Sequence, residues 1–345
     1  MPQRPTYIVT GGAGFVGSNL VAALQGASGE ARIVVVDNFR SGSFSNIVAA
    51  CQRRGGSEFS GEVVALGSPD VDWDWMVARY EPAAVFHLGA ITDTTVADES
   101  LMIRENVTRF DQMLRACAGS RVPLVYASSA ATYGTPPATR DRVPFALEAA
   151  GKPNNVYGFS KWLMESEHRR FVQDGAAGTK PSHIVGLRYF NVFGPGETKK
   201  GKMASMVYQL AGQMLDGKRP RIFADGSQAR DQVYVDDVID CTMAAAGLGA
   251  KKDPVPGVYN LGSGVATSFN QIIGAVRRAL GISDRDLPTD FFEMPPSIRA
   301  FYQDFTCADM SQTVQGLGWQ PRWKPEEAIA AYAAHLKSER QVGLR

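Results

Sequence analysis

The sequence predicts a doubly wound α/β fold, in which helices cover both faces of a parallel β-sheet, with a smaller, mostly helical second lobe. In the first half of the chain, short runs rich in β-branched residues alternate with amphipathic stretches, which is the pattern of βαβ units. Right-handed crossovers between parallel strands then place helices on both faces. After Asn191 the alternation changes to a segment rich in Gly, Lys and Arg, followed by further helical stretches.

Each strand expected in the first half is a short, largely apolar run. These runs are Tyr7–Thr10, Arg32–Val36, Glu62–Leu66, Ala84–His87, Leu124–Ala127 and His183–Arg188. The stretches between them predict helices, among them Asn19–Gln25, Asp72–Tyr80, Glu99–Ala118 and Asn155–Val172.

The second half divides between the sheet and the lobe. One helix is expected over Met203–Leu215, and two or three more between Ser268 and Lys337. A strand at Gln232–Val235, a helix at Asp236–Ala246 and a strand at Val258–Leu261 predict a return to the sheet. We therefore expect a dinucleotide-binding domain of residues 1–192 plus 232–263, and a substrate lobe of residues 193–231 plus 264–338.

The composition argues against several classes of protein. The formal net charge is +1 over 345 residues and the basic residues are scattered, so no nucleic-acid partner is expected. The four cysteines form no Cys-x-x-Cys and the four histidines stand apart, which predicts reduced thiols and no metal site. No apolar run approaches the ~20 residues of a membrane span, and no signal peptide opens the chain. A cytoplasmic protein is expected.

A glycine-rich turn, Thr10-Gly-Gly-Ala-Gly-Phe-Val-Gly17, follows the first expected strand and opens a helix. In that context glycines admit a pyrophosphate to backbone amides at the helix amino end. Asp37 ends the second strand, where a carboxylate can bind the ribose hydroxyls of adenosine. Tight strand-to-helix turns also use glycine for purely structural reasons, and Asp37 makes that interpretation weaker.

Two further features suit proton transfer next to a dinucleotide. Tyr157 and Lys161 are four residues apart on an expected helix and so share one face. A neighbouring ammonium favours the phenolate and would lower the pKa of the phenol, as would a positively charged nicotinamide ring. Ser128 and Ser129 follow a strand, at the edge where open α/β sheets bind ligands. Taken alone, an ordinary surface pair and a polar turn would explain each feature equally well.

In this chain order, the three features resemble the extended short-chain dehydrogenase/reductase family, and the resemblance covers nearly the whole chain. It implies a Rossmann fold in which the glycine loop binds the dinucleotide. Several segments resemble, more narrowly, the ADP-glyceromanno-heptose 6-epimerases: His87–Thr95, Tyr126–Gly134, Gly186–Pro195, Lys200–Ser205, Tyr302–Thr306 and Ala308–Asp309. The Lys-Gly-x-Met-Ala-Ser and Tyr-Gln-x-Phe-Thr pieces are the specific ones.

This resemblance implies a role for each matching residue. The acid/base pair falls on Tyr157 and Lys200, with Ser129 as hydroxyl partner and Lys161 on the cofactor ribose. The implied cofactor contacts are Gly11, Gly14, Phe15, Val16, Gly17, Asp37, Asn38, Arg40, Leu88, Gly89, Ala90, Ile91, Thr92, Asn106, Tyr157, Lys161 and Val192. The implied substrate contacts are Ser129, Asn191, Lys202, Gln209, Phe223, Ala224, Asp225, Gly226, Arg230 and Tyr302.

Three positions depart from the family pattern. Gln232 stands where an aromatic residue often follows the Arg-Asp pair, and Lys199 stands where a histidine often precedes the catalytic lysine. Phe44 replaces a lysine that would neutralise the 2′-phosphate of NADP, which leaves Arg40 as the nearest cation. The resemblance favours NADP, and the pairing of Asp37 with Phe44 keeps NAD as the alternative.

The expected activity is epimerisation of an ADP-heptose-type nucleotide sugar by transient oxidation and return of the same hydride, in a homo-oligomeric enzyme. A UDP-hexose 4-epimerase is the enzymatic alternative. A non-catalytic dinucleotide sensor would typically lack the Tyr157 and Lys161 pair. Sugar dehydratases of this fold commonly place an Asp-Glu pair after the active-site hydroxyl, where this chain has Ala130, Ala131 and Thr132. Dehydration is therefore not expected.

Overall fold

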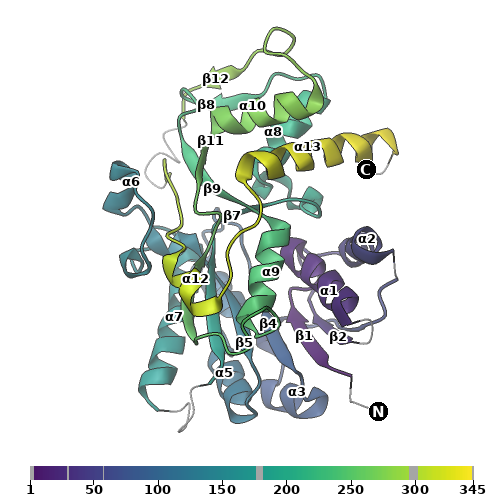
Figure 1. The fold of residues 1–345 in the computed structure, drawn as a ribbon. Helices are drawn as coiled ribbons and strands as arrows, with labels where there is room; N and C mark the ends of the chain where they lie inside the picture. Colours follow the sequence, from purple (N-terminus) through teal and green to yellow (C-terminus); the bar gives the residue numbers. More distant parts are fainter. Residues whose placement is uncertain (1–3, 29–30, 57, 176–181, 295–301, 344–345) are drawn as a thin grey trace.

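The computed structural model describes residues 4–28, 31–56, 58–175, 182–294 and 302–343. Its centre is a seven-stranded parallel sheet of strand order β10-β6-β5-β4-β1-β2-β3 (Figure 1). The strands are β1 (Thr6–Thr10), β2 (Arg32–Val36), β3 (Glu62–Val64), β4 (Ala84–His87), β5 (Leu124–Ser129), β6 (Ile184–Tyr189) and β10 (Gly257–Leu261). The strand order reverses between β1 and β4, which is where such sheets bind ligands. The predicted doubly wound fold is confirmed.

Helices cover both faces of this sheet. One face carries α1 (Phe15–Ser28), α2 (Phe44–Gly55), α9 (Val235–Ala245) and α12 (Ser311–Leu317); the other carries α3 (Trp73–Tyr80), α5 (Phe110–Gly119) and α7 (Val156–Gln173). Ile33 and Val35 of β2 pack with the first group, whereas Val34 packs with the second. Successive side chains of a strand point to opposite faces, so a strand buried on both faces is apolar throughout.

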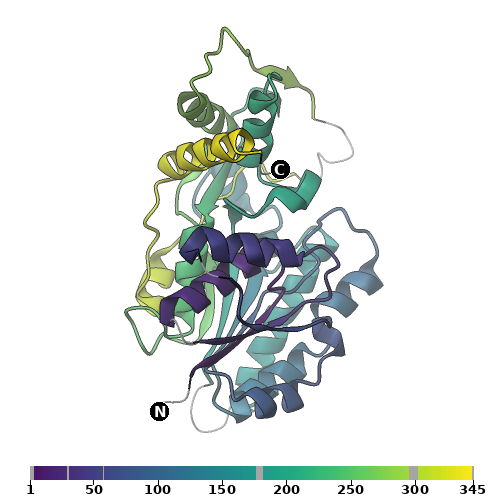
Figure 2. The same ribbon diagram turned by 90° about the vertical axis from the view of Figure 1, so that its right-hand side faces the viewer.

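A helical lobe lies above the sheet in Figure 1, and Figure 2 shows it from the side of α1 and α2. Its helices are α8 (Met206–Leu215), α10 (Phe269–Leu280) and α13 (Pro325–Gln341), which share a core that includes Leu210, Ile272 and Tyr332. Ser268 and Gln271 form a capping box at the start of α10. Two short parallel strands, β8 (Arg221–Phe223) and β12 (Asp290–Phe292), lie beside these helices.

A three-stranded sheet joins the lobe to the central sheet. It consists of β7 (Asn191–Phe193), β9 (Ala229–Tyr234) and β11 (Ala266–Ser268). The strand expected at Gln232–Val235 corresponds to the end of β9, since Val235 already begins α9. This strand does not belong to the central sheet, whereas β10 does. Three consecutive polar residues of β9, Arg230, Asp231 and Gln232, lie in this small sheet, where β9 pairs with β7 and β11.

The helix expected over Glu99–Ala118 is two helices, α4 (Glu99–Asn106) and α5. Arg109 lies between them with φ +63°, in the left-handed region, which interrupts the helical hydrogen bonds. Its guanidinium donates to the carbonyl of Val71 at 2.9 Å, which fixes the bend. The remaining short elements are η1 (Ser68–Asp70), η2 (Ala130–Tyr133), α6 (Pro137–Asp141), η3 (Leu147–Ala149) and η4 (Thr198–Met203).

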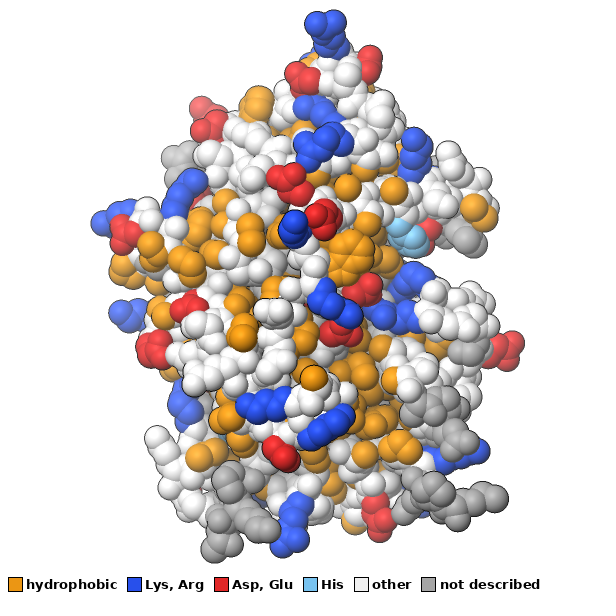
Figure 3. Space-filling model, in the orientation of Figure 1, with side chains coloured by type: hydrophobic (Ala, Val, Ile, Leu, Met, Phe, Trp, Pro, Cys, Tyr) orange, Lys and Arg blue, Asp and Glu red, His pale blue; other side chains and the backbone are white. Residues whose placement is uncertain are grey.

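Basic and acidic side chains are interspersed on the face shown in Figure 3, with no stripe of one sign. Cys51, Cys117, Cys241 and Cys307 are buried free thiols. Within the described ranges, no group of three or more His, Cys, Asp or Glu side chains is placed to hold a metal ion. No helix in those ranges combines the length and the apolar character that a membrane span requires.

Candidate active site

A cavity of about 840 Å³ opens at the carboxyl ends of the central strands. Its walls come from the turns that follow β1, β2, β4 and β5, and from η4, β8, β9 and the start of α10 in the lobe. The volume lies within the usual range for cofactor and small-molecule sites. Both lobes therefore contribute to one site.

The turn between β1 and α1 is folded so closely that only glycine fits. Gly11 has φ +65°, and a Cβ on it would lie 2.7 Å from the Cα of Gly89. A Cβ on Gly17 would lie 2.0 Å from the carbonyl oxygen of Gly11. The amino end of α1 thus faces the cavity without side chains in between, which suits the pyrophosphate of a dinucleotide. All five residues expected in this turn line the cavity: Gly11, Gly14, Phe15, Val16 and Gly17.

Asp37 is buried at the end of β2 and lines the same cavity. Its carboxylate accepts hydrogen bonds from the backbone N–H of Ala13 at 2.9 Å and of Phe39 at 2.8 Å. A carboxylate offers about four acceptor positions, so Asp37 keeps capacity for ribose hydroxyls. Asn38 and Arg40 also line the cavity, whereas Phe44 is half exposed and contacts Phe59 instead.

Side-chain hydrogen bonds fix the backbone of the loop after β4. Thr10 Oγ1 accepts from the backbone N–H of Gly89 at 2.9 Å, and Asn106 Oδ1 accepts from that of Ile91 at 2.7 Å. The expected contacts Leu88, Gly89, Ala90, Ile91 and Thr92 all line the cavity. Asn106 does not: it is buried behind the loop, where its Nδ2 also donates to Ser160. Asn106 therefore supports the loop through hydrogen bonds to the backbone of Ile91.

Ser129, Tyr157 and Lys161 come together on the sheet side of the cavity. Asn155 caps α7 by accepting from the backbone N–H of Gly158 at 2.8 Å. A Cβ on Gly158 would lie 2.5 Å from the carbonyl oxygen of Ala131, so glycine lets the start of α7 meet η2 closely. This approach places Tyr157 beside Ser129, and the two side chains hydrogen bond.

The pKa values in this cluster correct one expectation. The charge of Lys161 was expected to lower the pKa of Tyr157, yet burial raises that pKa, with the Ser129 hydrogen bond as the opposing influence. Burial also lowers the pKa of Lys161 to about 7, which favours its neutral form. Its Nζ donates to the carbonyl oxygen of Ala127 at 2.9 Å. The phenol is therefore not activated by the lysine alone.

A fully buried carboxylate, which was not among the expected site residues, hydrogen bonds to the segments that carry this cluster. Glu165 lies four residues after Lys161 on α7. It accepts from Ser128 Oγ at 2.6 Å, and from Arg188 Nε at 2.9 Å and Nη2 at 2.8 Å. Glu165 thereby ties α7 to β5 and β6. It also distinguishes the two serines, since Ser128 is occupied by Glu165 while Ser129 bonds Tyr157. The four-residue spacing from Lys161 to Glu165 was the signal in the sequence that could have identified this carboxylate, because it places both residues on one face of α7.

Lys200 reaches the cavity from η4. Its Nζ lies 5.2 Å from the centre of the Phe15 ring, at the amino end of α1. Burial lowers the pKa of Lys200, and the nearby carboxylate of Glu197 opposes that shift. Glu197 is itself buried and accepts from the backbone N–H and hydroxyl of Ser205, at 2.6 and 2.8 Å.

The neighbouring lysines of η4 hydrogen bond to side chains of other segments. Lys199 lines the edge of the cavity and donates to Ser43 at 2.7 Å and Ser45 at 2.5 Å. Lys202 is exposed and donates to Thr95 at 3.2 Å, outside the cavity lining. Gln209 is also outside, and its amide donates to the carbonyl of Ala204 at 2.7 Å.

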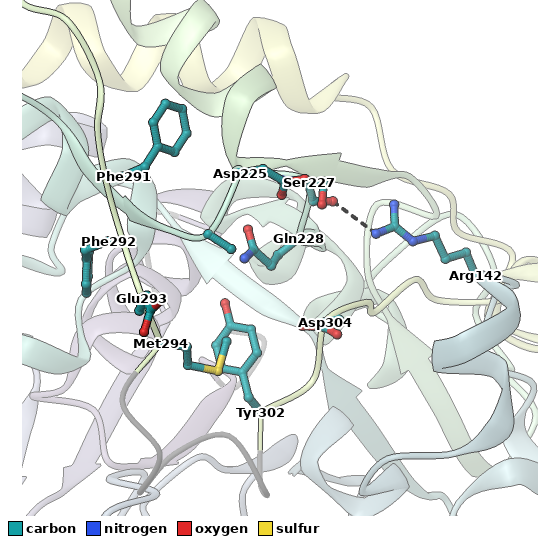
Figure 4. A pocket seen from close by; sticks show the side chains of 11 residues that line it. Arg142, Asp225, Ser227, Gln228, Phe291, Phe292, Glu293, Met294, Tyr302 and Asp304 are labelled. Carbon is teal, nitrogen blue, oxygen red and sulfur yellow. Dashed lines mark hydrogen bonds between the residues drawn. The ribbon is translucent and has the colours of Figure 1, made fainter.

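The remaining expected substrate contacts divide between two cavities. Asn191, Phe223, Arg230 and Tyr302 line the large cavity, and so does Val192, which was expected as a cofactor contact. Ala224 and Asp225 line a second cavity of about 660 Å³, which Figure 4 shows together with the hydrogen bond from Arg142 to the carbonyl of Ser227. Tyr302 lines both, and the Arg230 guanidinium lies 4.8 Å from the centre of its ring. Gly226 lines neither cavity.

Solved structures of sugar epimerases resemble the whole chain in sequence and fold. The solved structure of ADP-L-glycero-D-manno-heptose-6-epimerase from Helicobacter pylori is 32% identical, with a TM-score of 0.80 and 97% of each chain covered. UDP-N-acetylglucosamine 4-epimerase from Methanobrevibacter ruminantium, in complex with UDP-N-acetylmuramic acid, is 24% identical, with a TM-score of 0.81 over 98% of this chain and 99% of the other.

UDP-glucuronic acid 4-epimerase from Bacillus cereus, in complex with UDP-glucuronic acid and NAD, is also 24% identical, with a TM-score of 0.76 over 96% of this chain and 99% of the other. At 24% identity, the two UDP-sugar epimerases show that the chain shares their fold. Residues 7–262 match the model of the NAD dependent epimerase/dehydratase family. The chain therefore belongs to this family of nucleotide-sugar epimerases, built on the Rossmann fold of the extended short-chain dehydrogenases/reductases.

Proposed function

We propose that the protein interconverts ADP-D-glycero-D-manno-heptose and ADP-L-glycero-D-manno-heptose by inverting the sugar carbon C6. One observation carries this proposal: Tyr157 from α7 and Lys200 from η4 line one cavity. Inversion with return of the same hydride needs acid/base groups on two sides of the carbon, and two lobes can supply them. The Helicobacter pylori enzyme, at 32% identity against 24% for the UDP-sugar epimerases, supports the heptose substrate.

Residues on the sheet side are suited to the first proton transfer. Tyr157 removes the hydroxyl proton from the sugar carbon, and Ser129 holds the substrate oxygen and the phenol oxygen in line. Lys161 and Asp37 would hold the two ribose units of the dinucleotide. A nicotinamide bound there would supply hydride uptake and return. Burial raises the pKa of Tyr157, and the positive charge of an oxidised nicotinamide ring would oppose that shift.

The ketone formed on the substrate then rotates, so that its opposite face is turned toward the cofactor site. Lys200 gives a proton to the substrate oxygen on that face as the carbon regains its hydrogen. For a complete turnover, one of the two groups must start deprotonated and the other protonated. The reverse reaction exchanges their roles, so Tyr157 and Lys200 together serve both directions.

A panel of nucleotide sugars tests the substrate assignment. Purified protein incubated with ADP-D-glycero-D-manno-heptose is expected to yield a mixture of the two C6 epimers, resolved by chromatography and NMR. UDP-glucose and UDP-N-acetylglucosamine, run beside it, are expected to remain unchanged. Turnover of a UDP-hexose without turnover of the heptose would overturn the assignment in favour of a 4-epimerase.

The cofactor prediction concerns the dinucleotide that the purified protein retains. An epimerase must return the hydride it removed, so heat-denatured protein is expected to release a nicotinamide dinucleotide, identified by mass spectrometry. We expect NADP, because Arg40 lines the cavity beside Asp37 and a guanidinium binds phosphate well. Arg40→Ala should then weaken NADP binding about tenfold and leave NAD binding nearly unchanged. Release of NAD alone would reverse the preference, and failure to bind either would contradict the redox mechanism.

A further inference from the structure

Gln232 carries an unusual side chain for its position. It lies in the middle of β9, is 2% exposed and lines the large cavity. Its side-chain oxygen Oε1 is buried, and no donor among the described residues reaches it. Buried polar groups in folded proteins nearly always have a hydrogen-bond partner, because desolvating one without a partner costs free energy.

The alternation of β9 explains which side the amide faces. Arg230 and Gln232 are two residues apart and share a face, while Asp231 points to the other. Asp231 is fully satisfied there: it accepts from the backbone N–H of Ser263 at 2.6 Å and of Ala308 at 2.9 Å, among other donors. Asn191 of β7 pairs with Gln232 in register, so a second amide borders the same part of the cavity. The unpartnered group is therefore the one that faces the cavity.

The chemistry of this face suits a sugar. The Arg230 guanidinium is the group for a diphosphate, since it donates in a planar fork. A neutral amide both accepts and donates, which matches a hydroxyl. The amide is 2% exposed, and a hydrogen bond made in such a buried place is stronger than one made in water. The extended short-chain enzymes that this chain resembles often have an aromatic residue here, which lacks the amide's combination of a carbonyl acceptor and an N–H donor.

We propose that Gln232 is a specificity-determining residue that hydrogen bonds a hydroxyl of the substrate's glycosyl group. This inference rests on the nucleotide-sugar part of the proposed function and not on the heptose itself. A donor on the sugar would satisfy the buried Oε1 only in the complex, so the bond contributes to binding without an equal contribution to the free protein. Sugars that lack a hydroxyl at the contacted position should bind more weakly.

Gln232→Leu removes the amide and keeps nearly the same volume. In isothermal titrations of the holoenzyme with ADP-D-glycero-D-manno-heptose, its Kd is expected to rise about tenfold. The Kd for ADP alone should stay within about twofold, because ADP lacks the sugar. The thermal unfolding midpoint of the ligand-free variant should equal or exceed that of the wild type, since an unpartnered polar group has been removed. Gln315→Leu, at an exposed position of α12, is the matched control and should change neither Kd.

Two results would overturn the proposal. An equal loss of affinity for ADP and for the nucleotide sugar would place the amide on the nucleoside diphosphate, and an unchanged affinity for both would leave Gln232 without a ligand role. If the wild type instead acts on a UDP-hexose, the same comparison is made with that sugar and UDP. Failure of the heptose assignment is therefore distinguishable from failure of the Gln232 assignment.

Discussion

Tyr157→Phe is expected to lower turnover by about 10² or more while cofactor binding is kept, because acid/base groups typically contribute that much. The substitution removes only the hydroxyl that bonds Ser129, so the ring still fills its place at the start of α7. The carbon–hydrogen bond of the sugar cannot be oxidised efficiently unless the hydroxyl proton leaves with it. The loss should therefore fall on kcat, with KM little changed.

Steady-state kinetics and a titration with the dinucleotide check this result. Tyr259→Phe is the matched control, because it removes a hydroxyl that donates to the carbonyl of Val255, outside the cavity lining. The control enzyme should turn over normally. A Tyr157→Phe enzyme with near-normal kcat would remove Tyr157 from the mechanism, and loss of dinucleotide binding would show that the tyrosine acts mainly on the cofactor.

Lys200→Met should also lower kcat by about 10², with KM nearly kept, if Lys200 is the second acid/base group. The competing explanation is that the lysine holds the substrate diphosphate as a point charge, and loss of such a contact mainly raises KM. Gly201, with φ +54°, follows it and allows the sharp turn of η4. The partial burial of the Lys200 side chain beside Phe15 and Glu197 favours the catalytic role.

Lys202→Met is the comparison, since Lys202 is exposed and bonds Thr95 instead of lining the cavity. It should leave kcat unchanged. The pH profile gives a second readout: as a proton donor Lys200 is active below its pKa, so the wild type loses kcat as pH rises through that pKa. Lys200→Met should lack that alkaline limb. Normal turnover of Lys200→Met at saturating heptose would leave Tyr157 to serve both faces alone.

The sequence by itself determined the central sheet and the contacts that depend on local geometry. Strands such as Arg32–Val36 were identifiable because a strand buried on both faces is a nearly continuous apolar run, here residues 33–36. The glycine turn was identifiable because only glycine tolerates its backbone path and close approaches. Tyr157 and Lys161 were identifiable because four-residue spacing fixes one face of a helix.

Only the tertiary structure decided the features that depend on segments far apart in the chain. It placed β9 in the small sheet, and it buried Asn106, which was expected as a cofactor contact, behind the loop that follows β4. It also brought Glu165 onto Arg188 and Ser128, and it left the amide of Gln232 facing the cavity without a partner. Spacing fixes which residues share a face, but burial and long-range hydrogen bonds set what that face meets. The same burial raises the pKa of Tyr157 where the sequence argument, based on charge alone, predicted a fall.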